Sequence, residues 1–147
     1  MTRKITYFLI LDESFMNNVL EKSFDLKDGD SIDLVHIFEK HTYFSNLSTF
    51  NFPSESQEEE IRNSIVDILD SYKEKLKAKK NLAININSHC LFSSSPKEEA
   101  VNFLEKNKTD VAVVATREKN GLKGFFTSSF ADYLCRHGKS DVYVTKH

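Results

Sequence analysis

Residues that could bind a charged group are concentrated in two segments of the chain. Asp12 and Ser14 follow directly after the apolar run Ile5 to Leu11. Further along, residues 115–124 (ATREKNGLKG) lead towards the hydroxyl cluster Thr127-Ser128-Ser129. Hydroxyls and backbone N–H groups at the start of a helix can hold an anion, and nearby cations strengthen such a site. The candidate anion-binding residues of this second segment are Arg117, Lys119, Gly121, Ser128 and Ser129.

The same residues also have a purely structural interpretation. Asp12 can cap the helix that follows it, and the hydroxyls of Thr127-Ser128-Ser129 can cap the last helix of the chain. Glu118 is either a functional carboxylate or a solvated charge in a loop. The sequence leaves these alternatives open.

The remaining side chains form no recognised catalytic or metal-binding pattern. The five histidines lack metal-ligand spacing, and neither cysteine belongs to a CxxC motif. His36 lies within an apolar run and is expected to be a core residue. The chain has no Walker sequence, no Gly-x-Ser-x-Gly and no pair of carboxylates typical of acid–base catalysis. We expect neither catalytic residues nor a metal site.

Hydrophobic periodicity indicates the elements that must position these residues. Continuous apolar runs predict buried strands, whereas the strict alternation over residues 82–86 predicts a strand at the edge of a sheet. Residues 39–53 show no clear period and are predicted to form a long, partly packed loop. The predicted strands cover residues 5–11, 32–38, 82–86, 110–115 and 141–145.

Capping residues mark where the helices begin. Ser54 with Gln57, or Ser56 with Glu59, offers a capping box for a long helix that ends near Lys80. Another helix is expected after Ser95, with Pro96 at its first position and Glu98 closing the box. Apolar residues at helical spacing predict one more helix after Asp12 and another near residues 126–134.

Strands that alternate with helices predict a parallel sheet covered by helices on both faces. Right-handed crossovers then leave few topologies. We predict an α/β fold with one five-stranded parallel open sheet in the order 3-2-1-4-5, Rossmann-like, in a single domain over residues 1–147. Ligands of such sheets bind beyond the carboxyl ends of the strands. The loops after the first and fourth strands should meet there.

Charge and hydropathy limit the partners and the compartment. The formal net charge of −2 gives no general attraction to nucleic acid or to an anionic membrane. No apolar run reaches the length needed to cross a bilayer. The run Ile5 to Leu11 is short and is followed by Asp12-Glu13 without a small-residue cleavage site, unlike a signal peptide. We expect a cytoplasmic protein whose Cys90 and Cys135 are free thiols.

Three stretches of this chain resemble the universal stress protein family. They are the opening strand with Asp12-x-Ser14, the second strand with His36 in Leu34-Val35-His36-Ile37, and Asp110 to Lys146. The resemblance implies an adenine nucleotide alpha hydrolase-like fold. It places Asp12 where an acidic residue contacts the adenosine portion of a nucleotide, with Ser14 and Ile37 as further candidate contacts.

The resemblance also supplies a phosphate motif, which this chain departs from. The ATP-binding branch of the family carries Gly-x-x-Gly, nine residues, then Gly-Ser or Gly-Thr. Here the three glycines fall at Ala115, Glu118 and Ser128, and only the hydroxyl, at Ser129, is kept. A Cβ fills space that phosphate needs. The Glu118 carboxylate would repel a phosphate charge at ~4 Å by about 4 kcal/mol at an effective dielectric of ~20.

Two functions follow as hypotheses. The first is a non-enzymatic stress-response protein that does not bind ATP in the family's usual mode and needs no cofactor. The alternative is a nucleotide or small-anion binding domain, with ATP and Mg as ligand and at most weak ATPase activity, that uses Asp12, the basic loop and Ser129. The resemblance further implies a homodimer formed through the last strand, with Val142, Tyr143, Val144 and Thr145 at its interface.

Overall fold

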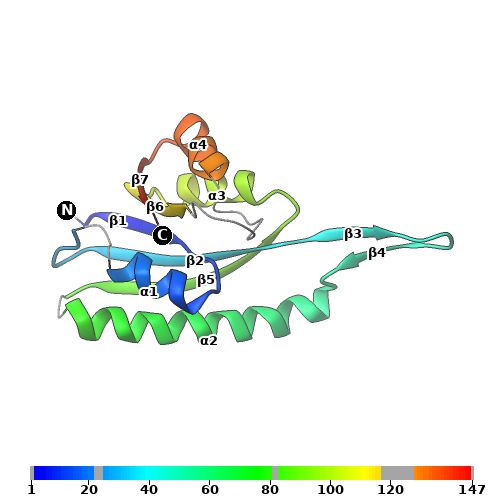
Figure 1. The fold of residues 1–147 in the computed structure, drawn as a ribbon, viewed down its shortest axis with the longest axis horizontal. Helices are drawn as coiled ribbons and strands as arrows, with labels where there is room; N and C mark the ends of the chain where they lie inside the picture. Colours follow the sequence, from blue (N-terminus) through cyan, green and yellow to red (C-terminus); the bar gives the residue numbers. More distant parts are fainter. Residues whose placement is uncertain (1, 22–24, 81–82, 117–127, 147) are drawn as a thin grey trace.

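The computed structural model describes residues 2–21, 25–80, 83–116 and 128–146. Strands and helices alternate along most of the chain (Figure 1). In chain order the elements are β1 (Lys4–Phe8), α1 (Glu13–Glu21), β2 (Ser31–Glu39), β3 (His41–Phe44), β4 (Thr49–Phe52), α2 (Glu55–Lys80), β5 (Asn85–Ser93), α3 (Pro96–Lys106), β6 (Val111–Thr116), α4 (Ser128–His137) and β7 (Asp141–Lys146). No helix in the described ranges is both long and apolar enough to span a bilayer.

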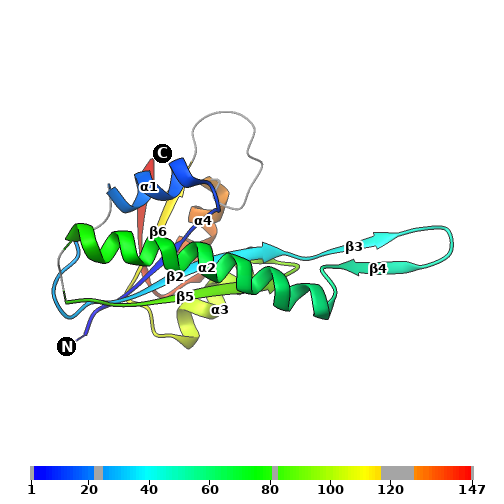
Figure 2. The same ribbon diagram turned by 90° about the horizontal axis from the view of Figure 1, so that it is seen from below.

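The main sheet has five parallel strands in the order β5-β2-β1-β6-β7. Without the two hairpin strands β3 and β4, this order reads 3-2-1-4-5, so the predicted fold and topology are confirmed. α1 and α2 cover one face of the sheet, and α3 and α4 cover the other (Figures 1 and 2). The carboxyl ends of β1 and β6 therefore meet near the centre of one edge, where the order reverses.

The core lies between the central strands and these helices. Leu34 and Val35 of β2 are fully buried, as are Ile5 and Phe8 of β1. Phe8 contacts Phe130 of α4 edge to face, with ring centroids 5.7 Å apart. Strands that are covered on both faces need continuous apolar sequence, which explains why these runs were recognisable.

A buried hydroxyl pair interrupts this apolar core. Thr6 of β1 is fully buried, and its Oγ1 lies 2.8 Å from Oγ1 of Thr109, which is 7% exposed. The hydrogen bond lets both hydroxyls be buried without an unsatisfied polar group.

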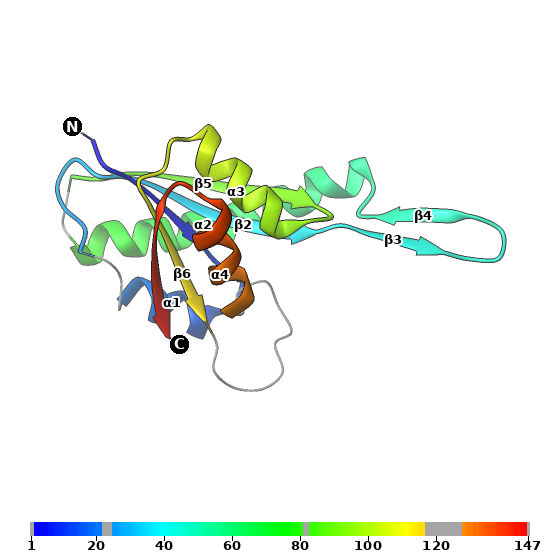
Figure 3. The ribbon, with the colours of Figure 1, turned by 90° about the horizontal axis from the view of Figure 1, so that it is seen from above.

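The prediction for residues 39–53 was wrong. This segment is not a loop but contains β3 and β4, which pair as an antiparallel hairpin with Tyr43 opposite Phe50. The hairpin extends from the end of β2 away from the sheet (Figure 3). All of its strand residues are exposed, so the usual contrast between a buried and a solvated face was missing from the pattern.

The position of the third predicted strand was also wrong, although its place at the edge is confirmed. The strand is β5, which begins at Asn85 and runs on to Ser93. The alternation holds over its first residues, since Ile86 is buried between the exposed Asn85 and Asn87. β5 extends further because it pairs with β2 over its whole length, as far as Glu39 opposite Ser93.

The predicted helix starts have mixed outcomes. The Ser54–Gln57 capping box is present: the Ser54 N–H donates to Gln57 Oε1 at 2.9 Å, and the Gln57 N–H donates to Ser54 Oγ at 3.4 Å. Pro96 begins α3 as predicted. Ser95 occupies the N-cap position, but its side chain makes no capping hydrogen bond, so that detail was wrong.

Candidate functional site

Asp12 joins the carboxyl end of β1 to the start of α1. Beyond β1, the Leu9 N–H still donates to the Val35 carbonyl at 2.8 Å, which keeps the chain against β2. Asp12 Oδ1 then accepts the Phe15 N–H at 2.9 Å, and the Asp12 carbonyl accepts the Met16 N–H at 2.9 Å. The structural interpretation of Asp12 as the cap of α1 is therefore confirmed.

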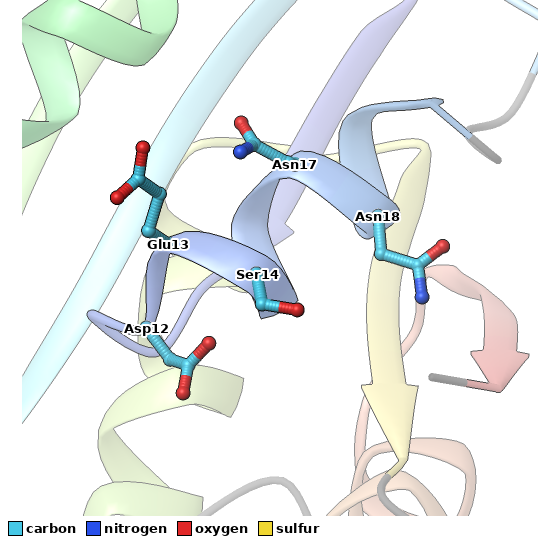
Figure 4. A pocket seen from close by; sticks show the side chains of 5 residues that line it. All are labelled: Asp12, Glu13, Ser14, Asn17 and Asn18. Carbon is cyan, nitrogen blue, oxygen red and sulfur yellow. The ribbon is translucent and has the colours of Figure 1, made fainter.

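A hollow of about 790 Å³ opens beside this helix start. The lining residues that the structure describes come from Asp12 and the first turns of α1, and Figure 4 shows them: Asp12, Glu13, Ser14, Asn17 and Asn18. Of these residues, only Asp12 and Ser14 were predicted from the sequence. The others had a usable signal, because Glu13 with Asn17 and Ser14 with Asn18 are spaced four residues apart and share a helix face.

The lining of this hollow is acidic. It presents two carboxylates, one hydroxyl and two amides, and no cation among its described lining residues. The N–H group of Phe15, which would otherwise face an anion at the helix start, already donates to Asp12. Such a surface accepts hydrogen bonds from hydroxyl and amino groups and disfavours multiply charged anions.

The negative charge at the start of α1 extends towards α2. Burial raises the pKa of the Tyr72 phenol above its ordinary value, and the charges of Glu13 and Asp12 raise it further. Tyr72 is only 4% exposed on the inner side of α2. The phenol thus stays protonated at neutral pH, and the Lys75 ammonium of α2 lies over its ring, 4.9 Å from the centroid.

Residues towards the carboxyl end of β2 are buried in the core and are not open to a ligand. His36 is 8% exposed, and its Nδ1 lies 2.8 Å from the Leu9 carbonyl, so Nδ1 is the donor. Burial lowers the pKa of His36, and this hydrogen bond opposes the shift only in part. His36 is confirmed as a satisfied core residue. Ile37, a predicted nucleotide contact, is 1% exposed within the same core.

The structure describes only part of the second candidate segment. Ala115, at the end of β6, is 1% exposed and lies opposite Thr145 of β7. Ser128 and Ser129 form the first turn of α4, and their side chains fall outside the described part of the chain. The other predicted residues of this segment also lie outside the described ranges: Arg117, Glu118, Lys119 and Gly121.

Among the other titratable side chains, His89 Nε2 lies 2.7 Å from Asp33 Oδ1. No cluster of three or more His, Cys, Asp or Glu side chains there could hold a metal ion. Burial raises the pKa of the Cys90 thiol to about 11, although the charge of Arg62 opposes this shift. A thiol that stays protonated at neutral pH is not a nucleophile. Cys90 and Cys135 are both free of disulfides.

β7 is an edge strand of the main sheet. One of its edges pairs with β6, and no described strand pairs with the other. Tyr143 and Val144 are 40% and 45% exposed, whereas Thr145 is 9% exposed and Val142 packs partly against the core. Of the residues predicted for a dimer interface, Tyr143 and Val144 are thus the accessible ones. Apolar side chains on an unpaired edge strand are a ready surface for association.

Comparison with solved structures supports the same fold. The hypothetical protein PH0823 has a TM-score of 0.68 and 17% identity, over 99% of this chain and 96% of that chain. A universal stress protein in complex with cAMP has a TM-score of 0.60 and 14% identity, over 98% and 96%. A universal stress protein family protein from Arabidopsis thaliana with AMP bound has a TM-score of 0.55 and 11% identity, over 99% and 92%.

The match of this chain to a protein-family model identifies its family. No curated protein matches the chain by sequence. The model of the universal stress protein family, in contrast, matches residues 12–146, which include α1, the whole sheet beyond β1 and the last helix. This chain belongs to the universal stress protein family.

Proposed function

We propose that this chain is a dimeric, cytoplasmic stress-response protein of its family that does not bind ATP in the family's usual mode. The observation that carries the proposal is at the position of the first motif glycine, where Ala115 stands at the end of β6 and is 1% exposed. A nucleotide site needs a backbone that phosphate can approach closely.

The charge of a triphosphate opposes its binding beside a carboxylate. By sequence, Glu118 takes the second motif glycine position, and a phosphate oxygen at ~4 Å from its carboxylate would be repelled by about 4 kcal/mol at an effective dielectric of ~20. Neither the capped Phe15 N–H nor the described lining of the hollow supplies a compensating positive charge. Of the two carboxylates that line the hollow, Asp12 already serves as the cap of α1.

The second candidate segment supports the same proposal. Ala115 takes the position of the first motif glycine and is 1% exposed, so a phosphate could reach its backbone only by displacing packed neighbours. Glu118 and Ser128 take the other two glycine positions in the sequence. Each substitution adds a side chain where the motif has none, and Glu118 adds a negative charge.

A second candidate function is favoured by the polar, hydroxyl-binding character of the hollow. Its carboxylates and the amides of Asn17 and Asn18 suit the hydroxyls of a ribose better than a polyphosphate. Two structural neighbours are described with AMP or cAMP bound, and these ligands carry a single phosphate. This chain would then be a nucleotide or small-anion binding domain with at most weak ATPase activity.

Isothermal titration calorimetry separates the two candidates. Mg-ATP and AMP are titrated separately into the purified full chain. The first candidate predicts no binding of Mg-ATP at micromolar concentrations, and a micromolar Kd would overturn it. The second predicts AMP binding that weakens at least about tenfold, or about 1.4 kcal/mol, in Asp12→Asn and Ser14→Ala. Asp67→Asn, an exposed carboxylate of α2, is the matched control and should leave AMP binding unchanged.

The proposed dimer uses the edge of β7. Two copies related by a two-fold axis would pair their β7 strands and bury Tyr143 and Val144. Val144→Asp places a charge at the centre of that contact and should halve the mass measured by sedimentation velocity at low micromolar concentration. An unchanged mass for this variant would exclude the β7 dimer.

The cytoplasmic location rests on the family and on the thiols. Cys90 and Cys135 are free, and Cys135 is exposed, which suits a reducing compartment. Cell fractionation of the untagged protein should recover it with cytoplasmic markers. Recovery in a membrane or secreted fraction would contradict this part of the proposal.

A further inference from the structure

The two faces of the β3–β4 hairpin differ in chemistry. Side chains that are paired across an antiparallel ribbon share a face, so the register groups His41 with Phe52 and Tyr43 with Phe50. We call these four residues the aromatic face. The rings of Tyr43 and Phe50 stack with centroids 5.2 Å apart and an interplanar angle of 20°. His41 lies 6.2 Å from Tyr43 on the same face.

The opposite face of the hairpin is mainly polar. Thr42 Oγ1 donates to Asn51 Oδ1 at 2.7 Å, and Thr49 lies opposite Phe44. An amphipathic ribbon of this kind normally lays its apolar face on a protein surface. In the part of the chain that the structure describes, the hairpin strands pair only with each other.

The aromatic face continues into the body of the protein. Phe52 lies 6.3 Å from Phe38 at the end of β2, and Phe38 lies 5.4 Å from Phe92 of β5. The guanidinium of Arg62 in α2 sits over Phe92 at 5.1 Å. This row of rings fixes the base of the hairpin to the sheet, so the aromatic face is held in one orientation as it leaves the body.

The exposed area of the aromatic face suits a weak, reversible contact. Tyr43, Phe50 and Phe52 are 45%, 57% and 37% exposed, and the His41 side chain is 51% exposed. At roughly 200 Å² for each large side chain, these residues together expose roughly 400 Å² per copy. Two copies packed face to face would bury roughly 800 Å², which is the size of a weak interface.

The charge of the hairpin favours a second copy over other partners. Residues 42–54 contain no acidic or basic side chain, so His41 is the one basic member of the aromatic face. A nucleic acid or an anionic membrane would therefore gain little electrostatic attraction there. Two copies of this face, which carry no carboxylate, ammonium or guanidinium group, meet with little like-charge repulsion. A lone two-stranded hairpin is marginally stable in water, so pairing with another hairpin would also stabilise each one.

We propose that the aromatic face of the hairpin docks on the aromatic face of a second copy of this chain, across a two-fold axis. Because the hairpin projects beyond the sheet (Figure 3), two hairpins can meet while the two sheets stay apart. The contact lies away from β7, at the opposite side of the sheet order. It is thus a second isologous interface, independent of the proposed β7 dimer.

Sedimentation velocity of the full chain tests the contact, with Val144→Asp as the background that removes the β7 contribution. In that background the chain should still be a dimer at about 100 µM, and the further changes Tyr43→Ser and Phe50→Ser should halve its mass. Phe44→Ser is the matched control, because Phe44 is 81% exposed on the other face and should leave the mass unchanged. Circular dichroism should be the same for all variants.

A fluorescence experiment tests the same face without disrupting it. The chain has no tryptophan, so a single introduced one reports its own surroundings. With rising concentration, the emission of Phe50→Trp should shift to the blue and lose its acrylamide quenching, whereas that of Phe44→Trp should not change. The proposal is overturned if the serine changes leave the mass unaltered, if both tryptophans stay solvent-exposed, or if the chain binds neutral lipid vesicles through the hairpin without self-association.

Discussion

β2 and the β3–β4 hairpin follow each other in the chain and contain similar side chains, yet their surroundings are opposite. Leu34, Val35 and Ile37 of β2 are at most 1% exposed, because helices cover both faces of the sheet. In the hairpin, Phe44 is 81% and Phe50 is 57% exposed. The comparison shows that apolar sequence forms a core only where the topology brings a second layer against it.

The difference also separates two roles for hydrophobic residues in this molecule. In β2 they supply the free energy that holds the fold together. In the hairpin they add little to the stability of one chain and are instead available for association. Matched substitutions in the two regions should therefore affect different measurements.

The largest difference is expected for leucines. Leu34→Ala in β2 leaves a cavity in the fully buried core and should lower the free energy of unfolding by about 2–5 kcal/mol. Leu47→Ala at the turn of the hairpin removes a side chain that is 97% exposed, so the change should stay within about 0.5 kcal/mol. Urea denaturation at one fixed protein concentration measures both. Equal losses of unfolding free energy in the two variants would contradict the proposed difference between β2 and the hairpin.

Hydrogen-bonded threonines should show a smaller difference. Thr6→Val leaves the buried Thr109 hydroxyl without its 2.8 Å partner and should cost about 1–3 kcal/mol. Thr42→Val removes an exposed hydrogen bond of similar length to Asn51, where water can take its place, and should cost at most about 0.5 kcal/mol. The same denaturation measurement applies. A large loss in Thr42→Val would mean that the hairpin is already covered by a partner.

The pH dependence of stability tests the buried side of the comparison through His36. Burial lowers the folded-state pKa of His36 below its ordinary value of 6.5. Between these two values the unfolded chain binds more protons than the folded one, so stability should fall as the pH drops below about 6.5. His36→Gln should flatten this part of the profile. A flat wild-type profile would contradict the assignment.

The parts of the fold that were predicted are those with burial on one or both sides. The runs in β1, β2 and β6 are apolar because two layers of helices cover them, and the periodic stripe of α2 faces the same sheet. The hairpin was missed because all its strand residues are exposed, although the alternation of Phe50 and Phe52 with Asn51 was visible. Solvent exposure removed the polar contrast that makes alternation informative.

The candidate site was predictable only in its first residues. Asp12 was found because a strand end followed by a capping residue is a local signal. Asn17 and Asn18 were missed because only their spacing distinguishes them. Each lies four residues after another lining residue, on the same face of α1. Ala115 was identified through the family motif, and its burial could not be derived from the motif alone.

The central claim is that this chain has lost the usual phosphate-binding mode, and restoring the motif tests it most directly. Calorimetry would compare wild-type protein with the triple variant Ala115→Gly, Glu118→Gly and Ser128→Gly in titrations with Mg-ATP, after thermal melting has shown that both are folded. The account predicts no micromolar binding in the wild type and a gain of at least about tenfold in the triple variant. Micromolar binding of equal strength in both proteins would contradict it.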